Sequence, residues 1–338
     1  MRVAFLNKLE DRLKDFPQRY LSDHEVLITD DDATLPAGVE NAEAVVWWSH
    51  PLDAGFIDRL PNLKFMQRVG LVRAKGDARS AVAKGIPVSV IPFGLSDRVA
   101  NHAFALTFDV VRKVTQSHKA VLDGVNPDNI PEEVTTTPAT ALNWSRIPNV
   151  ETLNDKTIGI VGYGEIGACY GRMMAPFNCR VLYHKRTRLT PAQEAHLGVE
   201  YASMDDLMAQ SDVVASFTPY TPESRHQLKA REFGLMKSTA YFVNCGRGNT
   251  VDELALIDAL QHRRIAGAGL DVFAVEPLPM ASPLRSLDNV VLTPHSAGGI
   301  QGWMESFERL RDNLRRVQAG RPVIFPMGPN DPQPGQVE

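Results

Sequence analysis

The sequence predicts an α/β protein of two doubly wound domains, each a parallel sheet with helices on both faces. Short apolar runs alternate with amphipathic segments of helical length along most of the chain, which is typical of parallel sheets joined by helical crossovers. The strand-like runs are too many for one sheet of ordinary size. A chain of 338 residues is also too long for one ordinary core.

The predicted strands form two groups, and each group predicts one sheet. Both groups are rich in Val, Ile, Leu and aromatic residues, as buried parallel strands are. The first group occupies residues 3–6, 25–28, 44–48, 63–67 and 87–91. The second occupies residues 157–162, 180–184, 212–217, 240–244, 266–272 and 289–293.

Two longer helices are expected at the ends of the second group. Residues 96–122 predict one continuous helix that bridges the domains, because apolar residues recur at steps of three and four, at Val99, Ala103, Leu106, Val110 and Val114. Residues 300–319 predict the other helix. Residues 123–154 are rich in Pro, Thr and Asn without a period, and a stretch of that length is usually functional or disordered.

Composition excludes several classes of protein. The net charge is −4 and the pI about 6.2, so we expect no nucleic acid and no membrane partner. Three cysteines without C-x-x-C spacing predict no metal site and suit a reducing compartment. The N-terminal apolar run, Val3 to Leu6, is a first strand rather than a signal sequence. No run approaches the roughly 18 apolar residues of a transmembrane helix, so we expect a cytoplasmic protein.

A glycine-rich loop predicts a dinucleotide site. The motif GYGEIG directly follows the strand at 157–162 and precedes a helical segment. In such a loop the glycines permit the turn, the close approach of a pyrophosphate and tight helix packing, while the helix N-terminus offers free N–H groups. An ordinary tight turn is the alternative. The predicted contacts are Gly162, Tyr163, Gly164, Glu165, Ile166 and Gly167.

A basic cluster, VLYHKRTR (181–188), lies where such folds usually place a ribose-binding carboxylate, about 20 residues past the loop. No Asp or Glu occurs between Cys179 and Pro191. The 2′-phosphate of NADP(H) would instead contact Lys185, Arg186 and Arg188, so NADP(H) is favoured. NAD(H) stays open, because these charges could also be merely solvated.

Three motifs after later strands carry candidate catalytic groups. NCGRG (244–248) contains Arg247, LDVFAVEPLP (270–279) contains Asp271 and Glu276, and TPHSAGG (293–299) contains His295. Parallel sheets bind ligands at the carboxyl ends of their strands, so these groups should converge. Hydride transfer to a 2-oxo acid needs a cation for the carboxylate and a proton donor for the carbonyl oxygen.

These motifs resemble the D-isomer-specific 2-hydroxyacid dehydrogenase family, in particular its glyoxylate/hydroxypyruvate reductases. The order and spacing match for GYGEIG, TPYTPESR (218–225), NCGRGNTVDE (244–253), LDVFAVEPLP and TPHSAGG. The resemblance implies a Rossmann dinucleotide-binding domain, 99–297, inserted into a flavodoxin-like substrate domain of 1–98 and 298–338. It also implies a homodimer formed through 123–154.

The implied activity is the reversible NAD(P)H-dependent reduction of a 2-oxo acid to a D-2-hydroxy acid. Arg247 would grip the substrate carboxylate through its planar fork. His295 would be the acid–base, and a nearby carboxylate, Glu276, would favour its imidazolium form.

The resemblance implies further contacts with both ligands. Those to the cofactor are Thr218, Pro219, Cys245, Gly246, Asp271, His295 and Ala297. Those to the substrate are Trp48, Ser49, Val69, Gly70, Arg247 and His295. We expect Cys245 to be a packed thiol rather than a nucleophile.

Some residues depart from the family or have no assigned role. LVRAKGD (71–77) lacks the family pattern, and Trp47 and Trp48 could favour a bulky substrate although one of them should be core. His102 and His118 are expected to be structural or solvated.

Two other functions stay open. A formate or phosphite dehydrogenase shares the fold, although formate dehydrogenases carry Gln where Glu276 stands. A dinucleotide-sensing corepressor could retain all three groups, and it would differ by showing no turnover.

Overall fold

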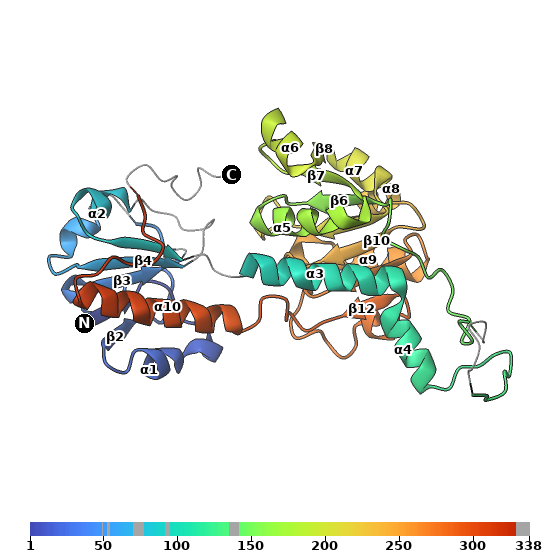
Figure 1. Cartoon of the computed structure of the whole chain (residues 1–338), viewed down its shortest axis with the longest axis horizontal. Helices are drawn as coiled ribbons and strands as arrows, with labels where there is room; N and C mark the ends of the chain where they lie inside the picture. The colour runs from blue at the N-terminus through green and yellow to red at the C-terminus, as the bar shows by residue number, and fades with distance from the viewer. Residues whose placement is uncertain (49, 53–54, 70–77, 92–94, 135–141, 329–338) are drawn as a thin grey trace. The chain divides into compact units, whose positions relative to one another are not determined.

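The computed structural model describes residues 1–48, 50–52, 55–69, 78–91, 95–134 and 142–328. The chain forms two compact units, which we call unit 1 (Met1–Leu95 and Gly299–Glu338) and unit 2 (Ser96–Gly298) (Figure 1). Unit 2 is thus an insertion in unit 1. The two crossings of the chain lie close to the predicted boundaries at 98/99 and 297/298.

Unit 1 contains, in its described residues, a five-stranded parallel sheet with the order β2-β1-β3-β4-β5. This is the flavodoxin-like order. The strands are β1 (Arg2–Phe5), β2 (Glu25–Ile28), β3 (Ala44–Trp47), β4 (Phe65–Val69) and β5 (Val88–Ile91). The helices are α1 (Phe16–Tyr20), α2 (Arg79–Ala83) and α10 (Gln301–Gln318).

The predicted C-terminal helix is confirmed as α10, which packs with α1 on one face of this sheet (Figure 1). Its buried stripe includes Phe307, Leu310 and Leu314, spaced by three and four residues. The ring of Phe307 stacks on Phe5 of β1 with centroids 5.5 Å apart. The amphipathic pattern therefore places this helix in the core of unit 1.

Unit 2 contains, as far as it is described, a seven-stranded parallel sheet with the order β12-β11-β10-β9-β6-β7-β8. The strands are β6 (Thr157–Val161), β7 (Arg180–His184), β8 (Val199–Tyr201), β9 (Val213–Ser216), β10 (Tyr241–Asn244), β11 (Gly267–Leu270) and β12 (Val290–Leu292). The order reverses between β6 and β9, which is where a doubly wound sheet opens a crevice for ligands.

Helices cover both faces of this sheet (Figure 1). They are α3 (Leu95–Arg112), α4 (Val114–Leu122), α5 (Glu165–Met174), α6 (Pro191–Leu197), α7 (Met204–Gln210), α8 (Ala230–Leu235) and α9 (Glu253–Gln261). One core joins α7, α8 and α9 to the strands. On the other face α3 and α5 meet, and the hydroxyls of Thr107 and Tyr170 lie 2.7 Å apart. Burial on both faces explains why the central strands of this sheet are mostly apolar.

The prediction of one continuous helix over 96–122 is wrong, because the helix is interrupted at Lys113, between α3 and α4. Lys113 has a left-handed backbone (φ 57°), and its ammonium lies 4.7 Å from the ring centre of Tyr241. The carboxylate of Asp109 accepts hydrogen bonds from the backbone N–H (2.8 Å) and hydroxyl (2.5 Å) of Thr115. Side-chain bonds of this kind compete with helix continuation. Val114, expected on the apolar face, is 56 % exposed.

The sequence pattern also misses β8, a three-residue strand at the edge of the sheet. Its central residue, Glu200, is exposed and ion-paired with Arg180 of β7. A strand this short with a charged centre has too little periodicity to recognise.

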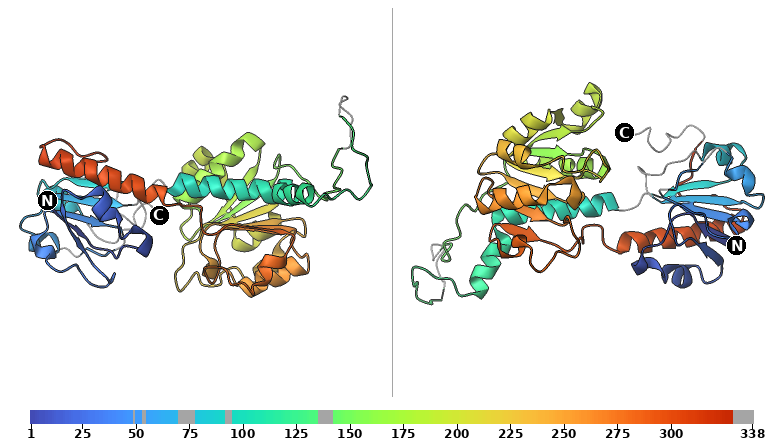
Figure 2. Two further views of the ribbon diagram at one scale, coloured as in Figure 1. Left: turned by 90° about the horizontal axis from the view of Figure 1, so that it is seen from below. Right: turned by 180° about the vertical axis from the view of Figure 1, so that it is seen from behind.

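No helix among the described residues has both the length and the hydrophobicity needed to cross a membrane. The described parts of 123–154 contain turns and bends without helix or strand. Together with α4 they extend away from the rest of unit 2 (Figure 2).

Candidate active site

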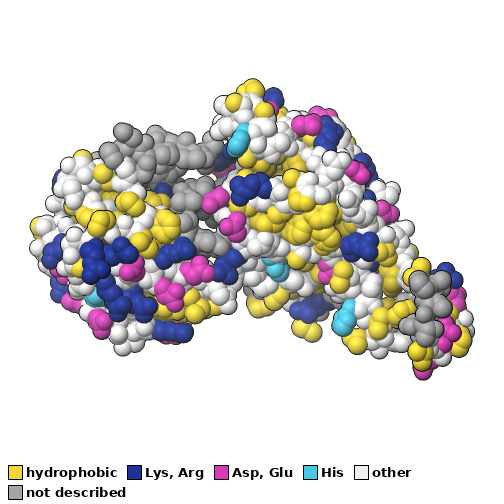
Figure 3. Space-filling view, viewed as in Figure 1, with side chains coloured by type: hydrophobic (Ala, Val, Ile, Leu, Met, Phe, Trp, Pro, Cys, Tyr) yellow, Lys and Arg dark blue, Asp and Glu magenta, His cyan; other side chains and the backbone are white. Residues whose placement is uncertain are grey.

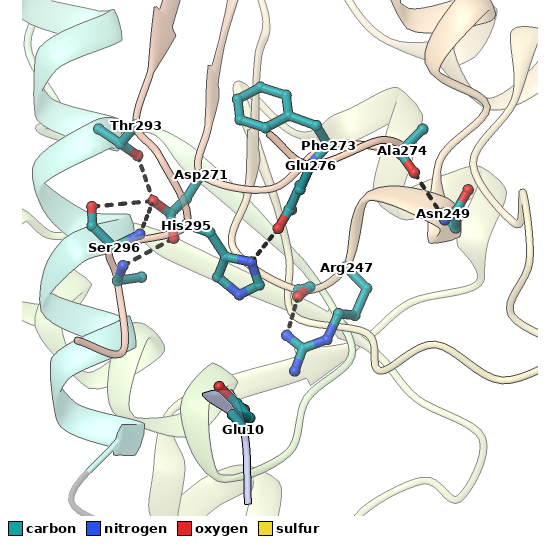
Figure 4. A network of polar contacts seen from close by, with 12 residues as sticks. Glu10, Arg247, Asn249, Asp271, Phe273, Ala274, Glu276, Thr293, His295 and Ser296 are labelled. Atoms are coloured by element: carbon teal, nitrogen blue, oxygen red, sulfur yellow. Dashed lines mark hydrogen bonds and ion pairs between the residues drawn. The ribbon is translucent and has the colours of Figure 1, made fainter. Parts of the chain in front are cut away.

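The candidate catalytic groups lie after three neighbouring strands of unit 2. Arg247 follows β10, Glu276 follows β11 and His295 follows β12, and these strands pair side by side. Their carboxyl ends therefore meet at one edge of the sheet, which brings the predicted side chains into one cluster (Figure 4).

His295 and Glu276 form a hydrogen-bonded pair. The imidazole Nδ1 lies 2.6 Å from Glu276 Oε2, and Glu276 Oε1 accepts the backbone N–H of Phe273 at 3.0 Å. Because a carboxylate accepts, Nδ1 carries the proton in this contact, and Nε2 is left to exchange one with a ligand. Both side chains are partly exposed, 44 % for His295 and 34 % for Glu276. The pair is thus oriented by the protein and accessible from solvent.

Asp271 anchors the turn that carries His295. Its backbone carbonyl accepts the N–H of His295 at 2.8 Å. Its buried carboxylate accepts the hydroxyl of Thr293 (2.6 Å) and the N–H groups of Ser296 (2.9 Å) and Ala297 (3.0 Å). Burial alone would raise the pKa of Asp271, but hydrogen bonds, the largest from His102, hold that pKa below its usual range. Asp271 and Ala297, both predicted cofactor contacts, are therefore hydrogen-bonded to each other, from the Ala297 N–H to the Asp271 carboxylate.

The turn that carries Arg247 is also fixed by neighbouring side chains. Asn244 Oδ1 accepts the N–H of Gly246 (3.0 Å), and the hydroxyl of Thr250 donates to the Arg247 carbonyl (2.7 Å). The guanidinium is exposed and donates to the Gly246 carbonyl at 2.7 Å. Asn244 and Thr250 belong to the recognised NCGRGNTVDE motif, but their side-chain roles were not predicted.

The Arg247 turn and the Glu276 loop are joined through closely packed backbone. A Cβ on Gly248 would lie 1.9 Å from the carbonyl carbon and oxygen of Phe273. Asn249 donates to the Ala274 carbonyl (3.2 Å), and Glu253 accepts the Ala274 N–H (2.9 Å). These contacts explain why the motif has glycine at 248, and they set the spacing between the two segments that carry Arg247 and Glu276.

The first prediction follows from this contact. Gly248→Ala should lower the free energy of unfolding by about 3 kcal/mol, the upper range for overpacking, because backbone atoms must move. Gly234→Ala on α8 is the matched control, since a Cβ there meets no atom within 4 Å. Urea unfolding measures both. Equal unfolding curves for the two variants would contradict the close packing.

The dinucleotide loop has the geometry that its three glycines predict. Gly162 has φ +88°, and a Cβ there would lie 2.9 Å from the Thr218 nitrogen. A Cβ on Gly164 would meet nothing within 4 Å, so the backbone is open to a ligand, whereas one on Gly167 would lie 2.9 Å from the Gly162 carbonyl. The helix α5 begins at Glu165, and its first N–H groups have no partner within the helix. These features fit a bound pyrophosphate.

Of the other predicted cofactor contacts, Gly246 packs against the segment that contains Thr218, whereas Tyr163 and Cys245 are buried. A Cβ on Gly246 would lie 2.9 Å from the Thr218 nitrogen, so the two segments are neighbours. Tyr163 is buried against Tyr183, with ring centres 4.8 Å apart, and its side chain belongs to the core. Burial raises the pKa of the Cys245 thiol far above its usual value, as expected of a packed residue.

The basic residues after β7 lie in different surroundings. Arg188 forms a two-point ion pair with Glu194, at 2.8 and 2.9 Å, and lies over the ring of Tyr201. Hydrogen bonds from Arg188 and Tyr183 lower the pKa of Glu194 to about 2. Glu194 lies three residues beyond Pro191, and its pairing with Arg188 was not predicted. Lys185 and Arg186 follow the strand directly.

The predicted substrate contacts outside unit 2 are only partly described. Ser49, Gly70 and the segment 71–77 lie outside the described residues. Trp47 is buried and Trp48 half-buried, as the alternation of strand side chains predicts. The ring of Trp48 meets that of Trp303 edge-on at 5.2 Å, and Val69 is buried at the end of β4.

A glycine loop that fits a pyrophosphate and an Arg–Glu–His cluster at the carboxyl edge of one parallel sheet are the features expected of a nicotinamide-dependent oxidoreductase. Residues 104–297 match the family model described as D-isomer specific 2-hydroxyacid dehydrogenase, NAD binding domain. The chain is 38 % identical over 258 residues to a glyoxylate reductase of Pyrococcus furiosus, covering 76 % of this chain and 73 % of that protein. It is 34 % identical over 272 residues to a glyoxylate/hydroxypyruvate reductase B of Yersinia enterocolitica, covering 80 % and 79 %.

Among solved structures, an NADPH-dependent glyoxylate/hydroxypyruvate reductase from Sinorhizobium meliloti is similar, with a TM-score of 0.65 and 25 % identity. That match covers 97 % of both chains. The chain therefore belongs to the D-isomer-specific 2-hydroxyacid dehydrogenase family. Its activity is the reduction of a 2-oxo acid by NAD(P)H.

Proposed function

We propose that this protein is an NADP(H)-preferring reductase of small 2-oxo acids, such as glyoxylate or hydroxypyruvate, and that the product is the D-2-hydroxy acid. The observation that carries the proposal is the His295–Glu276 pair beside Arg247 (Figure 4). The glycine loop is near the Arg247 turn, because Gly162 and Gly246 both pack against the Thr218 nitrogen. The names of the relatives support the substrate class, because several are glyoxylate or hydroxypyruvate reductases.

In the proposed reaction a bound NAD(P)H would supply the hydride that adds to the carbonyl carbon. Arg247 holds the substrate carboxylate and polarises the carbonyl oxygen through its planar fork. His295 delivers a proton from Nε2 to that oxygen as the C=O bond becomes C–OH. Glu276, bonded to Nδ1 at 2.6 Å, stabilises the imidazolium that is needed before transfer. One proton and one hydride are consumed for each hydroxy acid formed.

Titrations of purified protein with NADPH and NADH, followed by fluorescence, test cofactor preference. Each is repeated with glyoxylate, hydroxypyruvate and phenylpyruvate to follow oxidation, the last because Trp48 could favour an aromatic side chain. Tenfold tighter binding of NADPH, about 1.4 kcal/mol, would support the preference. Equal affinities would refute it. Binding without turnover of any 2-oxo acid would favour a dinucleotide-sensing protein instead.

The second prediction concerns the basic cluster. Replacing Lys185 and Arg186 together with Ala should weaken NADPH binding about tenfold or more and leave NADH binding within about twofold, because charge-assisted bonds to the 2′-phosphate are lost. Arg180→Ala is the matched control, since Arg180 is a cation at the opposite end of β7, paired with Glu200. An equal loss for both cofactors would place the phosphate elsewhere.

We also propose a homodimer formed through α4 and 123–154. Large apolar side chains are exposed there, at Leu122 (72 %), Val134 (86 %), Leu142 (86 %) and Trp144 (47 %). Hydrophobic side chains also reach the surface over α4 in Figure 3. Exposed apolar groups that cluster in this way are typical of protein interfaces. The proposed compartment is the cytoplasm, and the three cysteines, all free thiols, suit it.

The third prediction tests the dimer. Light scattering should give twice the chain mass of 37.3 kDa, and Leu122→Glu should shift the mass toward one chain, because a buried charge disfavours the interface. Leu254→Glu is the control, at a side chain 78 % exposed on α9. A wild-type mass of one chain would refute the dimer.

A further inference from the structure

His102 makes a polar contact with the turn that carries His295. The sequence around His102 did not predict this contact. It lies on α3, and its Nε2 is 2.9 Å from the hydroxyl of Thr293 and 3.3 Å from Asp271 Oδ1. Its side chain is only 24 % exposed. The contact spans most of unit 2 in sequence, from the first helix to the turn after the last strand.

The hydrogen bonds define which atom carries the proton. The Thr293 hydroxyl donates its single hydrogen to the Asp271 carboxylate, at 2.6 Å, so its oxygen can only accept from His102. The imidazole Nε2 must therefore carry a hydrogen, which it shares between Thr293 and Asp271. The buried carboxylate thus receives donors from α3 as well as from the 293–297 turn. A buried anion needs such donors to remain charged.

The residues around Asp271 lie close in sequence to both points where the chain passes between the units. The chain leaves unit 1 at Leu95 and returns to it at Gly299. His102 lies in the first two turns of the helix that begins at the first crossing, and Ala297, bonded to Asp271, lies just before the second. Within unit 2, a residue shortly after the first crossing and a residue shortly before the second are therefore hydrogen-bonded to the same carboxylate.

We infer that His102 is a positioning residue, which acts through Thr293 and Asp271 to fix the 293–297 turn and thereby the place of His295. The inference rests on the proposed role of His295 and deepens it. His295 itself has a left-handed backbone (φ 52°), a conformation that a non-glycine residue keeps only when its surroundings impose it. The N–H of His295 donates to the carbonyls of Asp271 (2.8 Å) and Thr293 (3.0 Å), the same residues that His102 holds.

The test compares two variants that differ by one methylene. A Gln side chain can place its amide nitrogen near the position of Nε2, whereas Asn reaches only the position of Nδ1. His102→Asn should therefore lower kcat about 10- to 100-fold, the cost of a small misplacement of a catalytic group, with KM and NADPH affinity within about threefold. His102→Gln should retain most of the activity. His196→Asn, at an exposed histidine on α6, is the matched control.

A second readout does not depend on catalysis. Hydrogen–deuterium exchange of the segment 293–298 should be faster in His102→Asn than in wild type, and near wild type in His102→Gln. Should His102→Asn fail to fold by circular dichroism, Thr293→Val and Thr293→Ser give the same comparison, since only Ser keeps the hydroxyl.

The inference would be overturned if His102→Asn had the exchange rate and kcat of the wild type. It would also be overturned if His102→Gln showed the same faster exchange and the same lower kcat as His102→Asn. A wild-type protein that turns over no 2-oxo acid would refute the proposed function alone. The exchange comparison would still decide the role of His102.

Discussion

Replacing His295 with Gln should lower kcat for 2-oxo acid reduction by about 10²- to 10⁴-fold, the contribution of a positioned general acid. Gln keeps a similar size but has no proton that it can give to an oxyanion. NADPH affinity should change little, because the glycine loop and the basic cluster are untouched. Steady-state kinetics and fluorescence titration measure the two effects separately.

The control for this variant is His196→Gln, an exposed histidine on α6. The double variant His295→Gln with Glu276→Gln should be no slower than His295→Gln alone, because groups that act as a unit are not additive. A further large loss in the double variant would mean that Glu276 acts independently of His295. Activity above a tenth of wild type in His295→Gln would exclude His295 as the acid.

Replacing Arg247 with Met should lower kcat/KM about 10³-fold, which corresponds to about 4 kcal/mol and lies within the range for removing one partner of a hydrogen-bonded charge pair. The fold should be unaffected, because the guanidinium is exposed and the turn is held by Asn244 and Thr250.

Arg247→Lys separates charge from geometry. It keeps the cation but loses the planar fork that binds carboxylate and carbonyl together, so kcat/KM should still fall at least tenfold. Substrate-concentration series with hydroxypyruvate measure both variants. Wild-type kcat/KM in Arg247→Met would mean that the substrate carboxylate binds elsewhere.

The local sequence pattern was sufficient to predict the two sheets and most of their strands. Strands such as β2 and β7 have the predicted bounds, because apolar runs bounded by turn residues are local features. The order of motifs along the chain also placed Arg247, Glu276 and His295 at the ends of neighbouring strands. Topology follows from such order, since consecutive parallel strands deliver their carboxyl ends to one edge.

Several features that were not predicted depend on contacts that the local pattern does not contain. The break at Lys113 involves Tyr241, which is far away in the sequence. The pairing of Arg188 with Glu194 is local, but Glu194 lies beyond the basic cluster, on α6. His102 looked like an ordinary helical histidine, because its partners Asp271 and Thr293 are far away in sequence. Periodicity reports which face of a helix is buried but not which polar group it meets there.

The most direct test of the central claim is the stoichiometry and handedness of the product. Purified protein is given NADPH and excess hydroxypyruvate, and the glycerate formed is resolved by chiral chromatography. We expect one D-glycerate for each NADPH oxidised, with about a hundredth of that amount or less formed by His295→Gln in the same time. Formation of L-glycerate, or binding of NADPH without oxidation by any 2-oxo acid, would contradict the assignment of Arg247, Glu276 and His295 to this reaction.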